Sequence, residues 1–452
     1  MKRISLATII FSSALLATSE VSTLAEVFNE ASMSGNVKYY YIQTDKDKSA
    51  QNAVNTSAYA NTVGGQFHFD TASLYGFRSG VTFMTTNPFL LGPNVDASII
   101  GRDNGVRVEG NPSGNVASKG FSILAEAYLA YDYKNMGIYV GREVIRTPLI
   151  DAKVVRLLPS AVEGTSLYYK VGKTSKIDVA YYNAFKQRTS DVFINIIKHA
   201  LGDQTKTITG SDSGYVGMLG INHKTEKYSV GLYNYYASDF MNSLYLGGSY
   251  KTNIADAKVT LEAQYINQKS IGNADAYFSA NAGTYGGKIS SNAFGFKVTT
   301  SLRSAKFFIA YSKVLQESAK HDGLVLPWDG TPLFTNMITS NDLFLSNYGK
   351  SLGSDSIYIG GSRGIKLGYV QKFDAIGLDG VSTTLTYLNT ANSRFNRDQN
   401  DYNIVLQYKI PKAFTLQLKG ILVQNNTSAD AAGKITQLKQ LIQYRVIANY
   451  KF

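Results

Sequence analysis

The feature that most restricts the fold is an alternation of apolar and polar residues with a period of two along much of the chain. From Phe121 to Tyr133 the odd positions are apolar or aromatic, and Glu126 falls on the other face. The C-terminal stretch QLIQYRVIANYKF repeats the pattern, with Arg445 and Lys451 between apolar neighbours. Side chains of a strand point alternately to its two faces, so this period indicates strands with one apolar and one polar face.

Segments with this alternation, separated by turn signals, predict about 18 strands. The connections between them alternate between short and long, with one exception at 239–241. An up-and-down meander with this asymmetry is typical of outer-membrane β-barrels, which have tight periplasmic turns and long external loops. The predicted strands lie near 36–44, 58–70, 74–86, 120–133, 136–141, 163–171, 176–187, 214–223, 226–238, 242–252, 257–269, 292–302, 305–316, 356–373, 379–390, 401–411, 413–424 and 439–452.

Such a sheet has to close on itself, because every backbone N–H and C=O group in hydrocarbon needs a partner. Charged residues make up 17% of the chain, which is low for a surface that only water covers. We therefore predict an all-β fold, a transmembrane antiparallel up-and-down β-barrel of about 18 strands. The alternative is a soluble β-sandwich or β-helix, which does not predict connections that alternate in length.

The alternation of the last strand also predicts which of its faces points into the barrel. A register slip of one residue would turn Arg445 and Lys451 toward lipid, at a cost of about 2–4 kcal/mol for a cation at mid-membrane. We therefore expect the face of Arg445 to line the lumen and the apolar face to contact lipid.

The first residues predict a secretory signal peptide, with Lys2 and Arg3 followed by an apolar stretch that ends near Ala17. Cleavage would follow Ser19 or Ala25, which leaves residues 26–452 as a single barrel domain. A buried N-terminal helix is the alternative. No later run approaches the roughly 18 apolar residues of a membrane-spanning helix, and the absence of cysteine excludes a disulfide framework.

Two internal stretches resemble the OprD-like porins of Gram-negative bacteria. GREVIRTPLIDAKVVRLLPSAVEG, residues 141–164, is similar to their third-loop segment, through its Arg-Leu-Leu-Pro and the following Gly164. KFDAIGLDGVSTTLTYL, residues 372–388, looks like one of their hairpins. The C-terminal Phe452 resembles the signal by which the barrel-assembly machinery recognises outer-membrane proteins, which most of them share.

This resemblance implies an 18-stranded barrel in the bacterial outer membrane whose third loop folds inward as a constriction. It also implies passive diffusion of small hydrophilic solutes, such as carboxylates or amino acids. The chain departs from the family at the wall, where a ladder of arginines is expected but Gly368 and Thr386 stand. Lys366 is the nearest substitute, inward by the phase of its neighbours.

The third loop carries the strongest candidates for pore lining, because cations grouped in a narrow passage attract carboxylates and speed their entry. An acidic residue that faces these cations across the passage can bind the amino group of a solute. We end the preceding strand at Gly141 and expect Arg142 and Glu143 in the loop, since either phase would otherwise turn one of them to lipid. The alternative is that the arginines tie the loop to the wall through salt bridges. The candidates are Arg142, Arg146, Asp151, Lys153, Arg156, Glu163, Lys366 and Arg445.

Other classes of function find little support in the sequence. The four histidines are scattered without ligand spacing, and no nucleophile and base form a pair, so we expect neither an enzyme nor a cofactor. Export and the lack of a clustered basic stripe disfavour nucleic acid. The expected partners are outer-membrane lipid and lipopolysaccharide, the solutes, the barrel-assembly machinery through Phe452, and further copies of the chain. The alternative function is an adhesive surface barrel that acts through the 317–355 loop, which contains Pro327 and Trp328.

Overall fold

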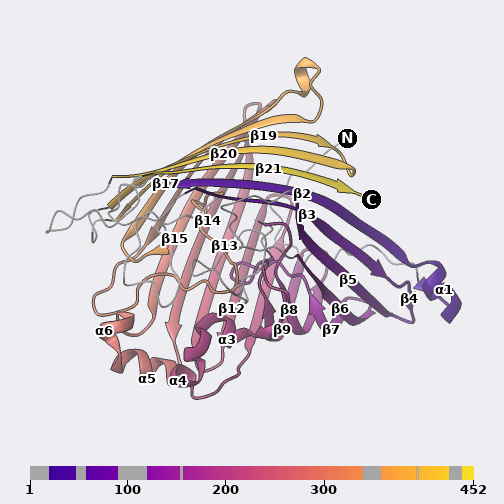
Figure 1. Ribbon diagram of the computed structural model, residues 1–452, viewed down its shortest axis with the longest axis horizontal. Helices are drawn as coiled ribbons and strands as arrows, with labels where there is room; N and C mark the ends of the chain where they lie inside the picture. Colours follow the sequence, from indigo (N-terminus) through magenta and orange to yellow (C-terminus); the bar gives the residue numbers. More distant parts are fainter. Residues whose placement is uncertain are drawn as a thin grey trace.

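One antiparallel sheet closes into a barrel. The computed structural model describes residues 20–46, 57–89, 120–152, 156–338, 358–392, 394, 397–426 and 440–452. Within them the sheet contains 21 strands, of which β1, β4 and β10 have two residues each, and the other 18 form a continuous ring. The ring is closed because β2 pairs with β21 as well as with β3, and Figure 1 shows β2 and β21 side by side.

The long strands follow one another around the barrel in chain order. The helices are short, and none of those described is long and apolar enough to cross a membrane. The strands are β1 (Glu20–Val21), β2 (Ser32–Lys46), β3 (Ser57–Asp70), β4 (Ser73–Leu74), β5 (Phe77–Pro88), β6 (Phe121–Tyr133), β7 (Met136–Glu143), β8 (Ala161–Val171), β9 (Ser175–Lys186), β10 (Ile194–Asn195), β11 (Val216–Lys224), β12 (Tyr228–Ala237), β13 (Met241–Ile254), β14 (Ala257–Ser270), β15 (Ser290–Leu302), β16 (Ala305–Val314), β17 (Ser362–Lys372), β18 (Val381–Asn392), β19 (Arg397–Ile410), β20 (Phe414–Asn426) and β21 (Gln440–Lys451). The helices are α1 (Leu24–Asn29), α3 (Ile196–Leu201), η1 (Gly202–Gln204), α4 (Thr205–Thr209), α5 (Gly272–Ala280), α6 (Ala282–Tyr285) and η3 (Asp374–Ile376).

The predicted strands are confirmed, because each predicted segment overlaps one of the long strands in the same order. The short connection predicted at 239–241 joins β12 to β13. Residues 1–19 lie outside the described residues, so the predicted signal peptide stays a prediction. At the start of the described chain, β1 pairs with β4, and Thr23 and Glu26 form a capping box for α1.

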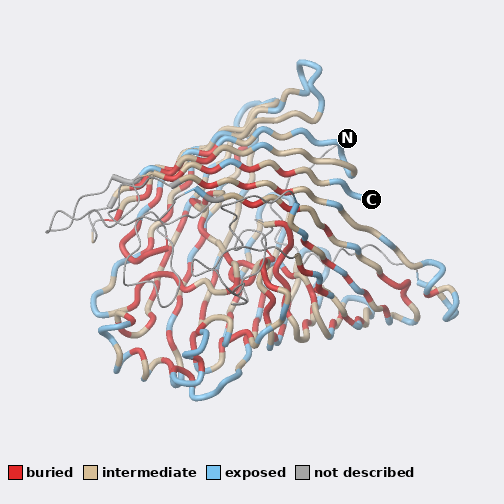
Figure 2. The backbone as a smooth tube through the Cα atoms, in the orientation of Figure 1, coloured by how far each residue is buried: buried red, intermediate tan, exposed pale blue. Residues whose placement is uncertain are grey.

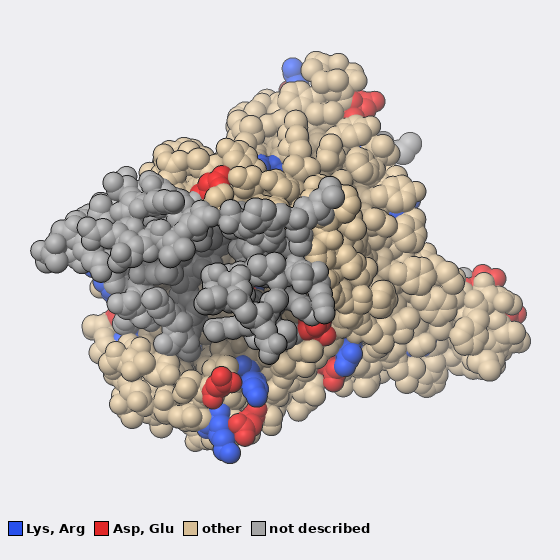
Figure 3. All heavy atoms as spheres, in the orientation of Figure 1, with Lys and Arg blue, Asp and Glu red and all other residues tan. Residues whose placement is uncertain are grey.

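Burial alternates along the strands as the period of two requires (Figure 2). In β5 the outward Phe83 is 47% exposed, whereas its neighbour Met84 is completely buried. On the face drawn in Figure 3, charged side chains are few and most of the coloured surface is formed by other residues. Many large hydrophobic side chains of the strands are exposed, among them Leu129, Phe296 and Phe307, as expected for contact with lipid. In β21 Arg445 is buried and Tyr444 is 51% exposed, which confirms the predicted phase.

The hydrophobic core lies inside the barrel. Its largest cluster joins inward wall residues to Ile145, Leu149 and Ile150 of the third loop and to Trp328 of the segment between β16 and β17. Leu157 and Leu158 of the third loop belong to a second cluster. The prediction of an inward third loop is thus confirmed, and a second inward segment accompanies it.

We predict that a new charge lowers the free energy of unfolding by different amounts on the two faces of the wall. Leu418 points outward in β20 and is 42% exposed, whereas the adjacent Gln417 points inward and donates to Gln407 Oε1 at 2.7 Å. We expect Leu418→Arg to lower the free energy of unfolding from lipid by about 2–4 kcal/mol. Gln417→Arg, at the same depth, should cost far less. Denaturant titration in lipid vesicles measures both, and equal losses would contradict the assigned phase.

Candidate functional site

The third loop, which the structure describes at residues 144–152 and 156–160, packs inside the barrel and is attached to the wall. Lys38 Nζ, on the inward face of β2, donates to the carbonyls of Arg156 at 3.2 Å and Leu157 at 3.0 Å. A short antiparallel bridge pairs Arg146 with Asp151 within the loop. These contacts fix the backbone of the loop, so the loop has a defined position inside the barrel.

A second segment, residues 315–338, packs against the third loop from the other side. Trp328 is 1% exposed, and its indole Nε1 donates to the carbonyl of Ile196 at 3.1 Å. The backbone N–H of Asp151 donates to the carbonyl of Trp328 at 3.1 Å, and Ile150 pairs with Asp329. A Cβ at Gly330 would lie 2.5 Å from the carbonyl oxygen of Leu149, so the two segments meet backbone to backbone there. We refer to these two packed segments together as the constriction.

Charged side chains fix Asp329 at this contact. Its carboxylate accepts hydrogen bonds from Arg188 and Ser160, which come from the two ends of the wall segment β8–β9. The side chains of Arg188 and Asp329 are both partly shielded from water, at 22% and 9% exposed, and the ion pair compensates their charges. The second segment is therefore tied to both the wall and the third loop.

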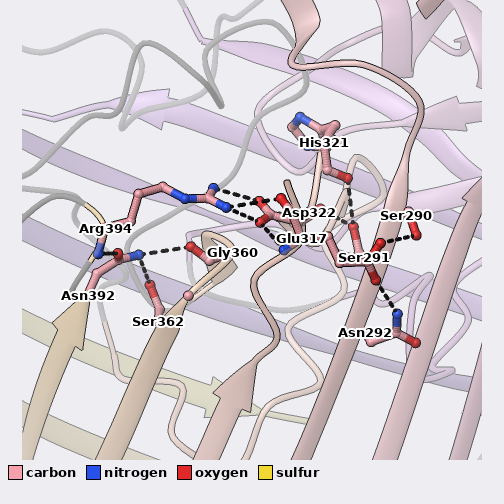
Figure 4. A network of polar contacts seen from close by, with 12 residues as sticks. Ser290, Ser291, Asn292, Glu317, His321, Asp322, Gly360, Ser362, Asn392 and Arg394 are labelled. Carbon is pink, nitrogen blue, oxygen red and sulfur yellow. Dashed lines mark hydrogen bonds and ion pairs between the residues drawn. The ribbon is translucent and has the colours of Figure 1, made fainter. Parts of the chain in front are cut away.

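The base of the second segment is held by the network in Figure 4. Arg394 donates to both carboxylate oxygens of Asp322, at 3.0 and 2.5 Å, and to the carbonyl of Glu317 at 3.2 Å. Asp322 is completely buried. The Glu317 carboxylate accepts from Ser290 and Asn292 of β15, both within 2.9 Å. A bidentate arginine contact is geometrically specific, so this end of the segment is fixed to the wall.

His321 in this network makes the packing of the segment sensitive to pH. It is 1% exposed, and burial lowers its pKa to about 4. An exposed histidine titrates near 6.5, so between about pH 6.5 and 4 the opened segment binds more protons than the packed one. Packing is therefore favoured at pH 7 and weakened as the pH falls through that window.

The only tryptophan of the chain, Trp328, reports on this effect. We expect its fluorescence to shift to the red and become accessible to iodide as the pH falls from 7 to 4. The His321→Asn variant keeps a neutral polar side chain and should show a much smaller change. An identical response of both proteins would show that another group controls the packing.

The inward face of the closing strands carries a basic strip, which we define as Lys38 of β2, Lys419 of β20 and Arg445 of β21. Lys419 lies directly opposite Arg445 in the strand register. Arg445 Nε donates to Gln443 at 2.7 Å, and its Nη1 donates to Tyr40 at 3.2 Å. Lys419 is half-buried and Arg445 is 3% exposed, so Lys419 can contact a solute while Arg445 acts through its field.

The neighbouring strands β3 to β6 contain acidic residues that are already bound within the wall. Asp70 lies 2.6 Å from His68 Nε2 and accepts from Tyr128 at 2.5 Å. Glu126 accepts from Thr82 and from the backbone N–H of Val144 at 2.9 Å. These carboxylates stabilise the wall rather than offering free acceptors beside the basic strip.

A hollow of about 620 Å³ opens below the constriction and is lined by inward residues of β7 to β16. Phe334 of the second segment and Lys297 of β15 both border it. Lys297 Nζ lies 2.7 Å from Glu262 and 5.6 Å from the centre of the Phe334 ring. Within the described residues no group of three or more histidine or acidic side chains is placed to hold a metal ion. The arrangement is that of a water-accessible passage.

The predicted site residues divide into four groups. Arg146, Asp151 and Arg156 lie in the constriction, and Lys366 and Arg445 point inward from the wall. Lys366 Nζ donates to the carbonyl of Asn336 at 2.5 Å, which makes it a support of the second segment. Lys153 lies outside the described residues.

The prediction that Arg142 and Glu143 belong to the loop is wrong, because β7 continues to Glu143. Arg142 shares the outward phase of Val140 and is neutralised by Glu163, its register partner on β8, at 2.7 Å. It also lies over the ring of Phe193 at 4.4 Å. Arg142 and Glu163 therefore form an ion pair on the outward side of the wall and do not line the pore.

Sequence reasoning missed Lys38, Lys419 and the second segment. Lys419 alternates with the apolar residues of its strand, and this phase could have identified it. Lys38 precedes three tyrosines, so its strand shows no clear alternation. The buried Trp328 also removes the observation behind the adhesive alternative, which had placed this residue on an external loop.

Comparison with known proteins agrees with this geometry. A family model described as outer membrane porin, OprD family, matches residues 25–452. The structure of Pseudomonas aeruginosa OccK9 (OpdG) superposes with a TM-score of 0.73 at 15% identity, over 94% of this chain and 99% of that chain. P. aeruginosa OpdK with vanillate gives 0.71 at 14% identity, with the same coverage. P. aeruginosa OccK2 (OpdF) in complex with glucuronate gives 0.66 at 12% identity, also over 94% and 99%. A search of curated proteins found no match.

Proposed function

The chain belongs to the OprD family of outer membrane porins, and from that premise we propose that its pore favours small solutes that carry a carboxylate. It is a passive channel of the bacterial outer membrane. The observation that carries the solute preference is the basic strip of Lys38, Lys419 and Arg445 beside the third loop. Fixed cations in a narrow passage raise the local concentration of anions.

The constriction supports the same preference. Arg146 and Arg156 lie in the third loop, and Asp70 and Glu126 of the neighbouring strands β3 and β6 are occupied by their own partners. Two structural relatives bind carboxylates, namely vanillate in OpdK and glucuronate in OccK2. For this chain we propose carboxylates or amino acids as solutes, with Asp151 as the candidate acceptor for an amino group.

We also propose that a signal peptide is cleaved after Ser19 or Ala25 and that the protein has no catalytic activity. The barrel-assembly machinery would recognise the protein through its last strand. Phe452 supports the last point, because its backbone N–H and carbonyl pair with Gly35 at the end of β2 while its side chain is 58% exposed. Lipid contacts the outward face, and association with further copies stays a proposal.

A salt-gradient recording in planar bilayers tests the function. Purified protein should insert as discrete conductance steps, and the reversal potential should have the sign of an anion-preferring pore. Adding benzoate or glucuronate in place of chloride should preserve the current. Steps with a cation-preferring reversal potential would refute the solute preference, and the absence of steps would refute the channel itself.

A further inference from the structure

The first described residues, 20–29, are folded onto one end of the barrel, and we call them the N-terminal segment. Strand β1 pairs in parallel with β4, so that Glu20 lies opposite Ser73 and Val21 opposite Leu74. Figure 1 shows α1 beside β4 at the edge of the barrel. The connection from β3 to β5 that contains β4 is short, and short turns of this barrel type face the periplasm. The N-terminal segment therefore lies at the periplasmic end.

Two further contacts attach the N-terminal segment to the turn between β3 and β5. The backbone N–H of Ala72 donates to the carbonyl of Val27 at 3.0 Å, and both residues are buried. The Glu20 carboxylate accepts from the backbone N–H of Gly76 at 3.2 Å. A buried backbone N–H that loses its partner is costly. The finished barrel thus uses the N-terminal segment to satisfy its first turn.

Helix α1 begins with a capping box. The Thr23 hydroxyl accepts from the backbone N–H of Glu26 at 3.3 Å. In return, Glu26 Oε2 accepts from the backbone N–H of Thr23 at 3.1 Å and from that of Ser22 at 3.0 Å. These bonds satisfy backbone donors that the start of a helix leaves without an intrahelical partner. The helix therefore depends on residues on both sides of the bond between Ala25 and Glu26.

Both candidate cleavage sites have small residues before the cut, as a signal peptide requires. Ala17 and Ser19 precede one site, and Thr23 and Ala25 precede the other. Cleavage after Ala25 would remove β1 and the N-cap of α1. Only four helical residues would remain, and so short a helix is unstable without its cap. The new α-amino group would also place a positive charge at the helix N-terminus, where the helix dipole disfavours it.

A signal peptide is discarded, so its residues have no reason to fit a barrel that folds after their removal. The N-terminal segment does fit the barrel, through β1, Glu20 and Val27. We propose that signal peptidase hydrolyses the bond between Ser19 and Glu20, and that residues 20–29 remain in the mature protein as a clasp on the turn between β3 and β5. Water adds across this bond and gives a Ser19 carboxylate and a free α-amino group on Glu20. The inference rests on the proposed signal peptide and selects one of its two cleavage sites.

Intact-mass spectrometry and N-terminal sequencing of protein purified from outer membranes test the cleavage site. The chain should begin at Glu20. A chain that begins at Glu26, or at any other residue, overturns the assignment, and a chain that begins at Met1 refutes the proposed signal peptide as well. Conductance in planar bilayers is measured on the same material, so a failure of the channel is distinguished from a failure of this assignment.

Ser19→Leu and Ala25→Leu form a matched pair, because each places the same large residue before one of the candidate cuts. Signal peptidase needs a small residue at that position. Ser19→Leu should accumulate precursor of full length, whereas Ala25→Leu should be processed like the wild type. Ala25 is exposed on α1, where leucine is a good helix former. Normal processing of Ser19→Leu, or accumulation of precursor in Ala25→Leu, overturns the proposal.

Hydrogen exchange in the folded protein tests the clasp. Thr23→Ala removes the N-cap and should make the peptide that contains Ala72 exchange about fivefold faster, as expected for the loss of a helix cap. Thr174→Ala is the control, because Thr174 is exposed in the short turn between β8 and β9 and is not the N-cap of a described helix. It should leave this exchange unchanged. Equal protection of Ala72 in the wild type and both variants would overturn the clasp.

Discussion

Lys419→Glu should remove most of the anion preference of the pore. The substitution places a carboxylate opposite Arg445 and changes the basic strip from three cations to two cations and one anion. At about 6 Å and an effective dielectric constant of about 20, one unit charge changes the energy of a passing carboxylate by about 3 kcal/mol. Water and salt in the lumen screen part of this. We expect the ratio of anion to cation permeability to fall about tenfold, which corresponds to about 1.4 kcal/mol.

The reversal potential in a salt gradient measures this ratio. Lys451→Glu is the matched control, because Lys451 has the same charge but is exposed at the periplasmic end of β21. It should shift the reversal potential only slightly. Lys419 makes none of the hydrogen bonds that position Arg445, so the variant should still fold. If Lys419→Glu and Lys451→Glu behave alike, the strip does not set the selectivity.

Trp328→Ala should release the second segment from the lumen and raise the conductance of the channel. Removing a fully buried tryptophan costs about 3–5 kcal/mol, and the hydrogen bond to Ile196 is lost as well. Asp322 and Glu317 still tie the base of the segment to the wall, so the part around residue 328 is the part that we expect to move. We expect single-channel records with a larger mean conductance and frequent steps between a narrow and a wide level.

Leu315→Ala provides the comparison for this result. Leu315 lies at the start of the same segment but is 39% exposed, so its truncation should leave conductance and noise close to those of the wild type. Solute selectivity should also decrease in Trp328→Ala, because a wider passage weakens the influence of fixed charges. A stable, unchanged conductance in Trp328→Ala would mean that the segment does not narrow the conducting path.

The strands of the wall could be predicted from the sequence, because the alternation of apolar and polar residues within each strand indicates which of its faces contacts lipid. Arg445 is an example, since its phase alone placed it inward. Arg142 shows the limit of this reasoning, because a cation on the outward face is acceptable only with Glu163 beside it. That pairing depends on the register between β7 and β8, which neither strand specifies alone.

The contents of the lumen were much harder to predict. The third loop was found through its resemblance to known porins, whereas Trp328 had no such guide and was assigned to an external loop. Its burial depends on partners such as Ile196 and Asp151, which are more than a hundred residues away in the chain. Local alternation contains no information on contacts of this kind.

The basic strip combines residues from the two ends of the chain. Lys38 comes from the first long strand, and Lys419 and Arg445 come from the last two. The charges of the basic strip are therefore brought together only when β2 pairs with β21 and closes the barrel. A nascent chain stalled before this step would have a wall without its filter. The pairing that closes the barrel is therefore also the step that completes the basic strip.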